Sequence, residues 1–289
     1  MENLNTKRLW LTAKWDATTN WKSSVRIMAG MTFGLLILYT VHFLNMLNVM
    51  YSPDYITSQY RSMAIETNIS FIVFMVAGAS LIFANMRTKQ QRIAFCMLPA
   101  SNAEKYIVRW LWATVGFALI FICASVAADL IRIVIWWIAG YGYTGSVVAT
   151  GTGILYESVC NVLANCGTAH TGDSIHALKQ KENYAIMTYC ISFCVMAHSF
   201  YILGGTLFRR NAWLLTTLTA IVLAIILLHT GNFPFIDGTL FGRRCSIEQK
   251  IMALYILSGI FAMLSVVFYI VSWKLFRRMQ VINDRTINL

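Results

Sequence analysis

The chain has 289 residues, of which 58% are hydrophobic and only 12% are charged. Soluble domains carry about 25% charged residues, so this composition excludes an ordinary soluble domain. The apolar residues come in blocks of about 20, enough to cross roughly 30 Å of hydrocarbon as a helix. The formal net charge is +11, but the cations flank the apolar blocks. We therefore assign them to topology and anionic lipid, not to nucleic acid, and expect an all-α integral membrane protein.

The first 26 residues are basic and contain Trp10, Trp15 and Trp21. Tryptophan prefers the headgroup level of a membrane, and lysine favours its cytoplasmic side. Residues 1–26 are thus predicted to form a cytoplasmic interfacial helix. A partly disordered cationic tail is the alternative.

The first two membrane spans are predicted over residues 27–50 and 69–86, with an exterior loop over 51–68. In the first span, three polar residues share one helical face: His42, Asn45 and Asn48. We interpret them as polar residues that lie near the outer headgroups of the membrane. A subunit interface or a substrate path is the other interpretation.

The sharpest local signal lies between Met86 and Trp110, a segment that we call the elbow. It carries the five cations Arg87, Lys89, Arg92, Lys105 and Arg109. Pro99 ends one helical run, because its ring fixes φ and removes a donor. The sequence from Ser101 to Glu104 then fits a capping box, so a new helix should begin near Asn102. We expect a bent, amphipathic, basic elbow on the cytoplasmic surface, where a cytosolic partner docks.

The helix that begins near Asn102 is predicted to reach about Ala139, and it forms the third span. Asp129 and Arg132 lie three residues apart on it. Asp129 is about 40 Å from the helix start, at or beyond the outer interface. We expect a local ion pair there, with a role in gating as the alternative.

Residues 141–183 are predicted to form a flexible exterior loop, because glycines alternate there with threonine and serine. The loop lacks the lysine of a phosphate-binding P-loop. Its possible ligands have no repeating metal spacing, so no metal or other cofactor is expected: Cys160, Cys166, His170, Asp173 and His176. A Cys160–Cys166 disulfide is an alternative if the loop faces an oxidising compartment.

Three further spans are predicted: 184–207, a fifth that ends near His229, and 251–273. A tight loop with Arg209 and Arg210 joins the fourth and fifth spans, and residues 231–250 could dip back into the outer leaflet. His198, within the fourth span, is interpreted as a packing residue. The six-helix membrane domain then covers 27–276, and a cytoplasmic tail covers 277–289.

Counting Lys and Arg residues supports this topology. With the N-terminus in the cytoplasm, 16 of the 23 lie on the inner side and six on the outer side. Inner loops carry the excess of positive charge in membrane proteins. We therefore expect six spans, with both termini, the elbow and the Arg209 loop in the cytoplasm.

Two stretches resemble a known family. LPASNAEKYIVRWL, Leu98 to Leu111, resembles the cytoplasmic loop that precedes the third span in permease subunits of type-2 ABC exporters. LGGTLFRRNAWLLT, Leu203 to Thr216, resembles a matching signature in a branch common in Bacteroidota. The chain lacks the large soluble exterior domain of bigger members, which leaves the substrate class open.

The resemblance implies a bacterial cytoplasmic-membrane protein that forms a homodimer or heterodimer with a second permease. It also implies two cytosolic ABC ATPase subunits, which use the ATP. Residues near the ATPase contact would be Leu98, Pro99, Ala100, Ser101, Glu104 and Lys105. We add Arg209 and Arg210, since their loop is predicted on the same face.

The sequence also allows three classes of function to be compared: a permease, a scaffold or sensor, and an enzyme. The chain has no nucleotide-binding signature, and its predicted spans have almost no carboxylates, which argues against an ion-coupled carrier. We expect an ATP-driven permease that moves a lipid-like or amphipathic substrate, or a peptide, outward. A non-transporting scaffold or sensor is the first alternative. A membrane enzyme that uses His198 or the exterior histidines is the second, although no nucleophile or metal set accompanies them.

Overall fold

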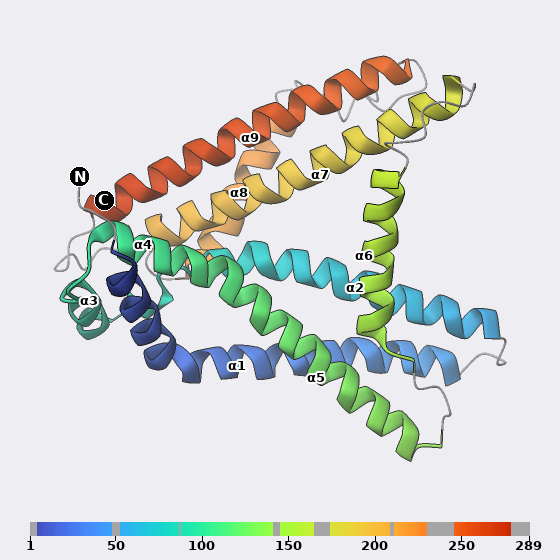
Figure 1. Cartoon of the computed structure of the whole chain (residues 1–289), viewed down its shortest axis with the longest axis horizontal. Helices are drawn as coiled ribbons and strands as arrows, with labels where there is room; N and C mark the ends of the chain where they lie inside the picture. The colour runs from blue at the N-terminus through green and yellow to red at the C-terminus, as the bar shows by residue number, and fades with distance from the viewer. Residues whose placement is uncertain are drawn as a thin grey trace. The chain divides into compact units, whose positions relative to one another are not determined.

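A computed structural model describes residues 5–47, 53–86, 88–140, 145–164, 174–208, 211–229 and 246–278. These ranges are almost entirely helical and contain no β-strand (Figure 1). The helices are α1 (Thr6–Leu47), α2 (Pro53–Ala79), the 3-10 helix η1 (Ala84–Met86), α3 (Lys89–Cys96), α4 (Asn102–Leu111), the π-helix η2 (Trp112–Gly116), α5 (Phe117–Ile138), α6 (Val147–Ala164), α7 (Ser174–Leu207), α8 (Ala212–His229) and α9 (Ile247–Arg278).

Five segments of the described chain are long and apolar enough to cross a membrane: Thr6–Met46, Asp54–Ala79, Asn102–Ile138, Leu178–Leu207 and Ile247–Arg278. Two shorter helical segments, Val147–Cys160 and Ala212–Ile226, are apolar as well. Transmembrane helices need roughly 20 apolar residues, which the five long segments supply. The expected all-helical character is thus confirmed for the described residues, with five segments that could each span a membrane.

The predicted loop over residues 51–68 is wrong, because α2 begins at Pro53. Proline is well suited to the first turn of a helix, and Asp54 follows it where negative charge favours the helix dipole. Within this stretch every third or fourth residue is buried: Ile56, Tyr60, Met63 and Thr67. That helical period outweighs the polar composition that suggested a loop.

The predicted loop over residues 141–183 is also wrong over most of its length. It contains α6, and α7 already begins at Ser174. The Ser146 hydroxyl caps α6 by accepting a hydrogen bond from the Ala149 amide at 3.1 Å. Gly151 packs closely on α2, where Asn68 Nδ2 donates to its carbonyl oxygen at 3.3 Å. Gly151 therefore lies in a helix that contacts α2, and not in a flexible loop.

The predicted interfacial segment, 1–26, is helical from Thr6 onward and continues into the first span without a break. The Asn5 side chain accepts a hydrogen bond from the Lys7 amide at 3.0 Å at the start of α1. Figure 1 shows that α1 bends after its first turns. Trp10 and Trp21 are exposed on this part of the helix, which is consistent with a headgroup location.

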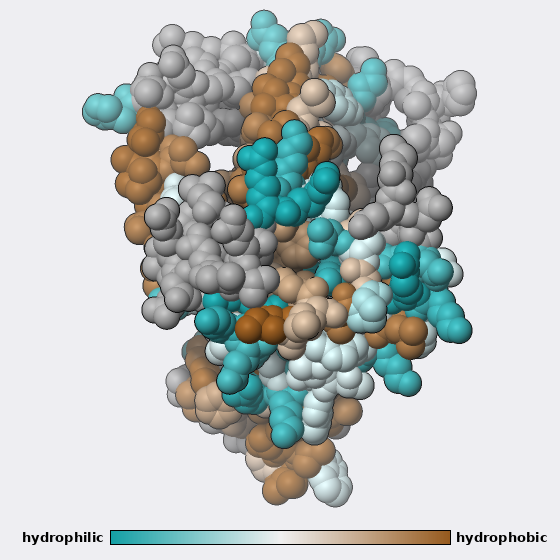
Figure 2. All heavy atoms as spheres, turned by 90° about the vertical axis from the view of Figure 1, so that its left-hand side faces the viewer, coloured by the Kyte–Doolittle hydropathy of each residue, from teal (hydrophilic) through white to brown (hydrophobic). Residues whose placement is uncertain are grey.

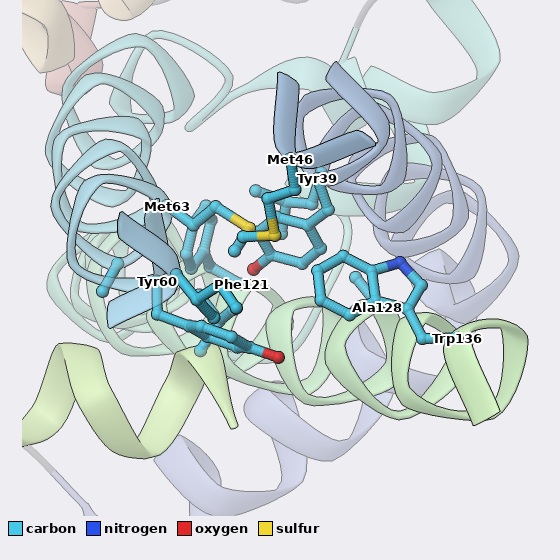
Figure 3. Close-up of a cluster of buried hydrophobic side chains, with 11 residues drawn as sticks. Tyr39, Met46, Tyr60, Met63, Phe121, Ala128 and Trp136 are labelled. Carbon is cyan, nitrogen blue, oxygen red and sulfur yellow. The ribbon is translucent and has the colours of Figure 1, made fainter. Parts of the chain in front are cut away.

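The chain divides into two compact units. The first comprises Met1–Met75 and Thr114–Val159. In its core, side chains from α1, α2 and α5 point toward one another (Figure 3), among them Tyr39, Tyr60, Met63, Phe121 and Trp136.

The second unit comprises Val76–Ala113 and Cys160–Leu289, and α7 packs along α9 within it. Helices α7 and α8 approach so closely that a Cβ atom at Gly204 would overlap the Thr216 side chain. A Cβ atom at Gly205 would overlap the Ser80 carbonyl. Both glycines of the LGGTLFRR stretch are thus explained by close backbone packing.

Candidate functional site

The elbow consists of two short helices that begin in the same way. At the start of α4, the Ser101 hydroxyl accepts from the Glu104 amide at 3.2 Å, and the Glu104 carboxylate accepts from the Ser101 amide at 2.8 Å. This is the predicted capping box, and α4 begins at Asn102 as predicted. Thr88 and Gln91 form a second capping box at the start of α3, which was not predicted. The same Thr-x-x-Gln spacing would have revealed it.

The turn between α3 and α4 exposes an apolar surface. Met97 is 78% exposed, and Ile93 and Pro99 are exposed beside it in the sequence. Phe95, in contrast, is buried and anchors α3. Contiguous exposed apolar side chains mark protein or membrane interaction sites, whereas single scattered ones are normal.

Helix α4 buries three ionisable side chains. Glu104 is 0% exposed, Lys105 is 5% exposed and Arg109 is 2% exposed. Lys105 Nζ donates to the carbonyl oxygen of Cys96, the last residue of α3, at 2.8 Å. Arg109 Nε donates to the carbonyl oxygen of Ile82, in the turn after α2. Because carbonyl groups at a helix end lack partners within the helix, Lys105 satisfies a carbonyl that α3 itself leaves unpaired.

The elbow also packs against the end of α9. Tyr106 donates its hydroxyl hydrogen to Ser272 Oγ at 3.0 Å. The Phe83 and Phe276 rings stack with their centroids 5.0 Å apart, and the Tyr106 ring lies edge-on to Trp273 at 5.2 Å. Aromatic pairs at such distances add stability beyond the burial of their surface. The start of α4 is thus fixed to the last turns of α9.

The last turns of α9 carry the exposed cations Lys274, Arg277 and Arg278. Arg277 lies over the Trp273 ring, 5.9 Å from its centroid. Cations at a helix C-terminus are favoured by the helix dipole. Figure 2 shows hydrophilic side chains among apolar ones on the face of the chain that it draws.

The predicted contact residues fall into two groups. Leu98, Pro99, Ala100 and Ser101 form the turn before α4, where Pro99 is exposed and the other three are partly buried. The two others, Glu104 and Lys105, point inward, so they hold the turn and do not form its outer surface. Arg209 and Arg210 lie outside the described residues, and the structure does not test whether they join this site.

Asp129 and Arg132 form a second polar centre, within the first compact unit. They make the predicted ion pair, with Arg132 Nη2 2.6 Å from Asp129 Oδ1. Both side chains are buried within the unit. Their predicted place at or beyond the outer membrane interface stays a prediction. Asp129 Oδ2 accepts from the Ser146 hydroxyl at 2.6 Å, and Arg132 Nη1 donates to the Tyr60 hydroxyl at 3.2 Å. The Arg132 guanidinium also lies over the Trp136 ring at 4.5 Å.

These contacts make the pair a brace between α5, α2 and the start of α6. This brace was not predicted, because the sequence pattern did not indicate a helix at α6. The hydrogen bonds to Ser146 and Tyr60 satisfy polar atoms of the two charged groups. Such bonds offset the desolvation cost of a buried ion pair. The alternative of a gating role stays a prediction.

No metal centre is apparent in the described part of the chain, where no three His, Cys, Asp or Glu side chains are placed to share an ion. Cys160 forms no disulfide among the described residues, and Cys166, His170 and Asp173 lie outside them, as does the His176 side chain. His198 Nδ1 is 3.1 Å from the Tyr269 hydroxyl. That contact fits the interpretation of His198 as a hydrogen-bonded packing residue.

Comparisons of the chain with protein-family models, with curated proteins and with solved structures found no match.

Proposed function

We propose that this chain is the membrane-spanning permease subunit of an ATP-driven type-2 ABC exporter. The observation that carries the proposal is the construction of the elbow. Its exposed turn is apolar, while the helix behind it is fixed by buried hydrogen bonds to α3, to the turn after α2 and to α9. A rigid element with an exposed apolar tip is suited to receive a force from a docked partner.

The resemblance of Leu98–Leu111 to the exporter loop supports the same function. The capping box within that stretch is present, so the stretch has the local structure that its sequence predicts. The chain has no nucleotide-binding signature of its own, and we assign ATP hydrolysis to two cytosolic subunits.

The few carboxylates of the spanning helices support an external energy source. Asp129 is paired with Arg132 and Ser146, and Glu66 with His42 at 2.9 Å. Ion-coupled carriers usually place free or cycling carboxylates in their spans. The pairing of Asp129 and of Glu66 favours a permease that is driven by a separate ATPase.

In the proposed assembly, the chain has six spans and both termini in the cytoplasm of a bacterium. Helix α8 is the fifth span, and its 18 residues extend about 27 Å, close to the hydrocarbon thickness. The chain pairs with a second permease, identical or related, and contacts anionic lipid through its basic ends. The substrate is lipid-like, amphipathic or a peptide, and no nucleic acid is bound.

Copurification from the native host tests the proposal. The chain is extracted in mild detergent, its partners are identified by mass spectrometry, and ATP hydrolysis is measured. We expect a stoichiometric ATPase, which Met97→Asn should release by removing the apolar tip of the elbow. Met252→Asn is a matched control, because Met252 is 66% exposed near the opposite end of α9. A chain that purifies with no ATPase would contradict the proposal and favour a scaffold or sensor.

A further inference from the structure

The exposed tip of the elbow and the helix that leads into the membrane are different elements. Ile93 and Met97 belong to α3 and the turn after it, whereas α4 is the helix that continues through η2 toward α5. The chain connects α3 to α4 only through residues 97–101, where Pro99 interrupts the backbone pattern. A displacement at the tip would be absorbed in this turn unless side chains connect the two helices.

Lys105 makes that connection. Its ammonium group reaches back over nine residues to the carbonyl oxygen of Cys96 at the end of α3. Arg109, one helical turn further along α4, binds the Ile82 carbonyl oxygen after α2. Residues four apart share a helix face, so one face of α4 holds both the end of α3 and the turn after α2.

Burying Lys105 and Arg109 costs free energy, because each charge loses its hydration. Filling the same space does not require a charge. A methionine or leucine of similar size would fill the same space without desolvating a charge. The cations instead make directional, charge-assisted bonds to backbone carbonyls, and at Cys96 the dipole of α3 also strengthens the contact. Such bonds fix an angle between helices more strictly than apolar packing does.

We propose that Lys105 and Arg109 are positioning residues, which clamp the end of α3 and the turn after α2 to α4 so that the elbow moves as one body. This inference rests on the proposed function for the source of the movement. It assigns the transmission to two inward-facing side chains, while the exposed turn only makes contact with the ATPase.

Hydrogen exchange and ATP hydrolysis together test the clamp. Lys105→Met keeps the length of the side chain but removes the donor. We expect backbone amides of α3 to exchange about tenfold faster, the effect of losing a hydrogen bond to a charged group. We also expect the ATPase to copurify as before, with its stimulation by the permease lost. Arg109→Met should show the same loss, with faster exchange near Ile82.

Two variants serve as controls. Lys105→Arg retains a donor and should restore coupling, whereas Lys274→Met removes an exposed lysine of α9 and should change neither readout. Unchanged exchange in α3 of Lys105→Met would overturn the clamp. Faster exchange with normal stimulation would overturn the positioning role. If the unaltered chain copurifies with no ATPase, the proposed function fails, and the exchange data still decide whether the clamp exists.

Discussion

The Tyr106 hydroxyl donates a hydrogen bond to Ser272 Oγ at 3.0 Å, although the two residues are 166 positions apart. The bond joins the first turns of α4 to the last turns of α9, and both side chains are buried. The aromatic contacts of Phe83 and Trp273 surround it. The second compact unit is therefore closed at this end by one polar contact within an aromatic cluster.

Tyr106→Phe should keep the aromatic packing and remove the hydroxyl. We expect a loss of about 0.5–1.5 kcal/mol in unfolding free energy, because the Ser272 hydroxyl loses a buried partner. Thermal unfolding in detergent, followed by circular dichroism, measures this change. Tyr255→Phe is the control, since Tyr255 is exposed on α9, the helix that contains Ser272. Equal stability of the two variants would show that the hydroxyl contact contributes nothing.

Ser101→Ala should remove the N-cap of α4. The expected cost is about 0.5–2 kcal/mol in unfolding free energy, with faster amide exchange in the first turn of α4. Ser246→Ala is a matched control, because Ser246 and Gln249 form the same reciprocal pair before α9. Both variants should lose similar stability, but only Ser101→Ala should reduce coupling to the ATPase. A coupling loss of the same size in Ser246→Ala would mean that stability alone controls coupling.

Asp129→Asn should leave the Arg132 cation buried without its counter-charge. Removing one partner of a buried ion pair lowers the unfolding free energy by about 3–5 kcal/mol. The first compact unit should therefore lose most of its thermal stability. Limited proteolysis and thermal unfolding in detergent measure this loss. Glu157→Gln removes an exposed carboxylate from α6 and should have little effect. A stable Asp129→Asn protein would show that the pair does not brace α5 and α6.

Gly204→Ala should separate α7 from α8, since the added methyl group would overlap the Thr216 side chain. Overpacking of this kind costs about 1–3 kcal/mol. At Gly259, in α9, an added Cβ would meet nothing within 4 Å. Gly259→Ala should therefore stabilise the protein by about 0.5–1 kcal/mol, because alanine favours a helix over glycine. Opposite signs for the two variants, measured by thermal unfolding, are the expected result.

The sequence predicted best where local chemistry decides the structure. Pro99 and the Ser101–Glu104 capping box locate the turn and the start of α4 to the residue, because both act through neighbouring backbone atoms. The long apolar blocks likewise predicted the membrane helices. The Thr88–Gln91 cap followed the same rule and was recognisable from its spacing.

The sequence predicted least where distant contacts decide. Residues 51–68 and most of 141–183 appear polar or glycine-rich, yet they are largely helical. Within 51–68, one face packs into the core of the first unit through Ile56, Tyr60 and Met63. The inward direction of Lys105 and Arg109 depends on carbonyl groups at the ends of other helices. Spacing within α4 shows that the two share a face, but it cannot show what that face contacts.

Site-specific photo-crosslinking tests most directly whether the elbow tip is the ATPase contact. A photoreactive amino acid is placed at Met97 or at Met263, which is 72% exposed in the middle of α9. After irradiation of native membranes, the photoreactive residue at position 97 should form an adduct with a cytosolic ATPase. The one at position 263 should react only with lipid or another membrane chain. An ATPase adduct at neither position, or at Met263 alone, would contradict the account.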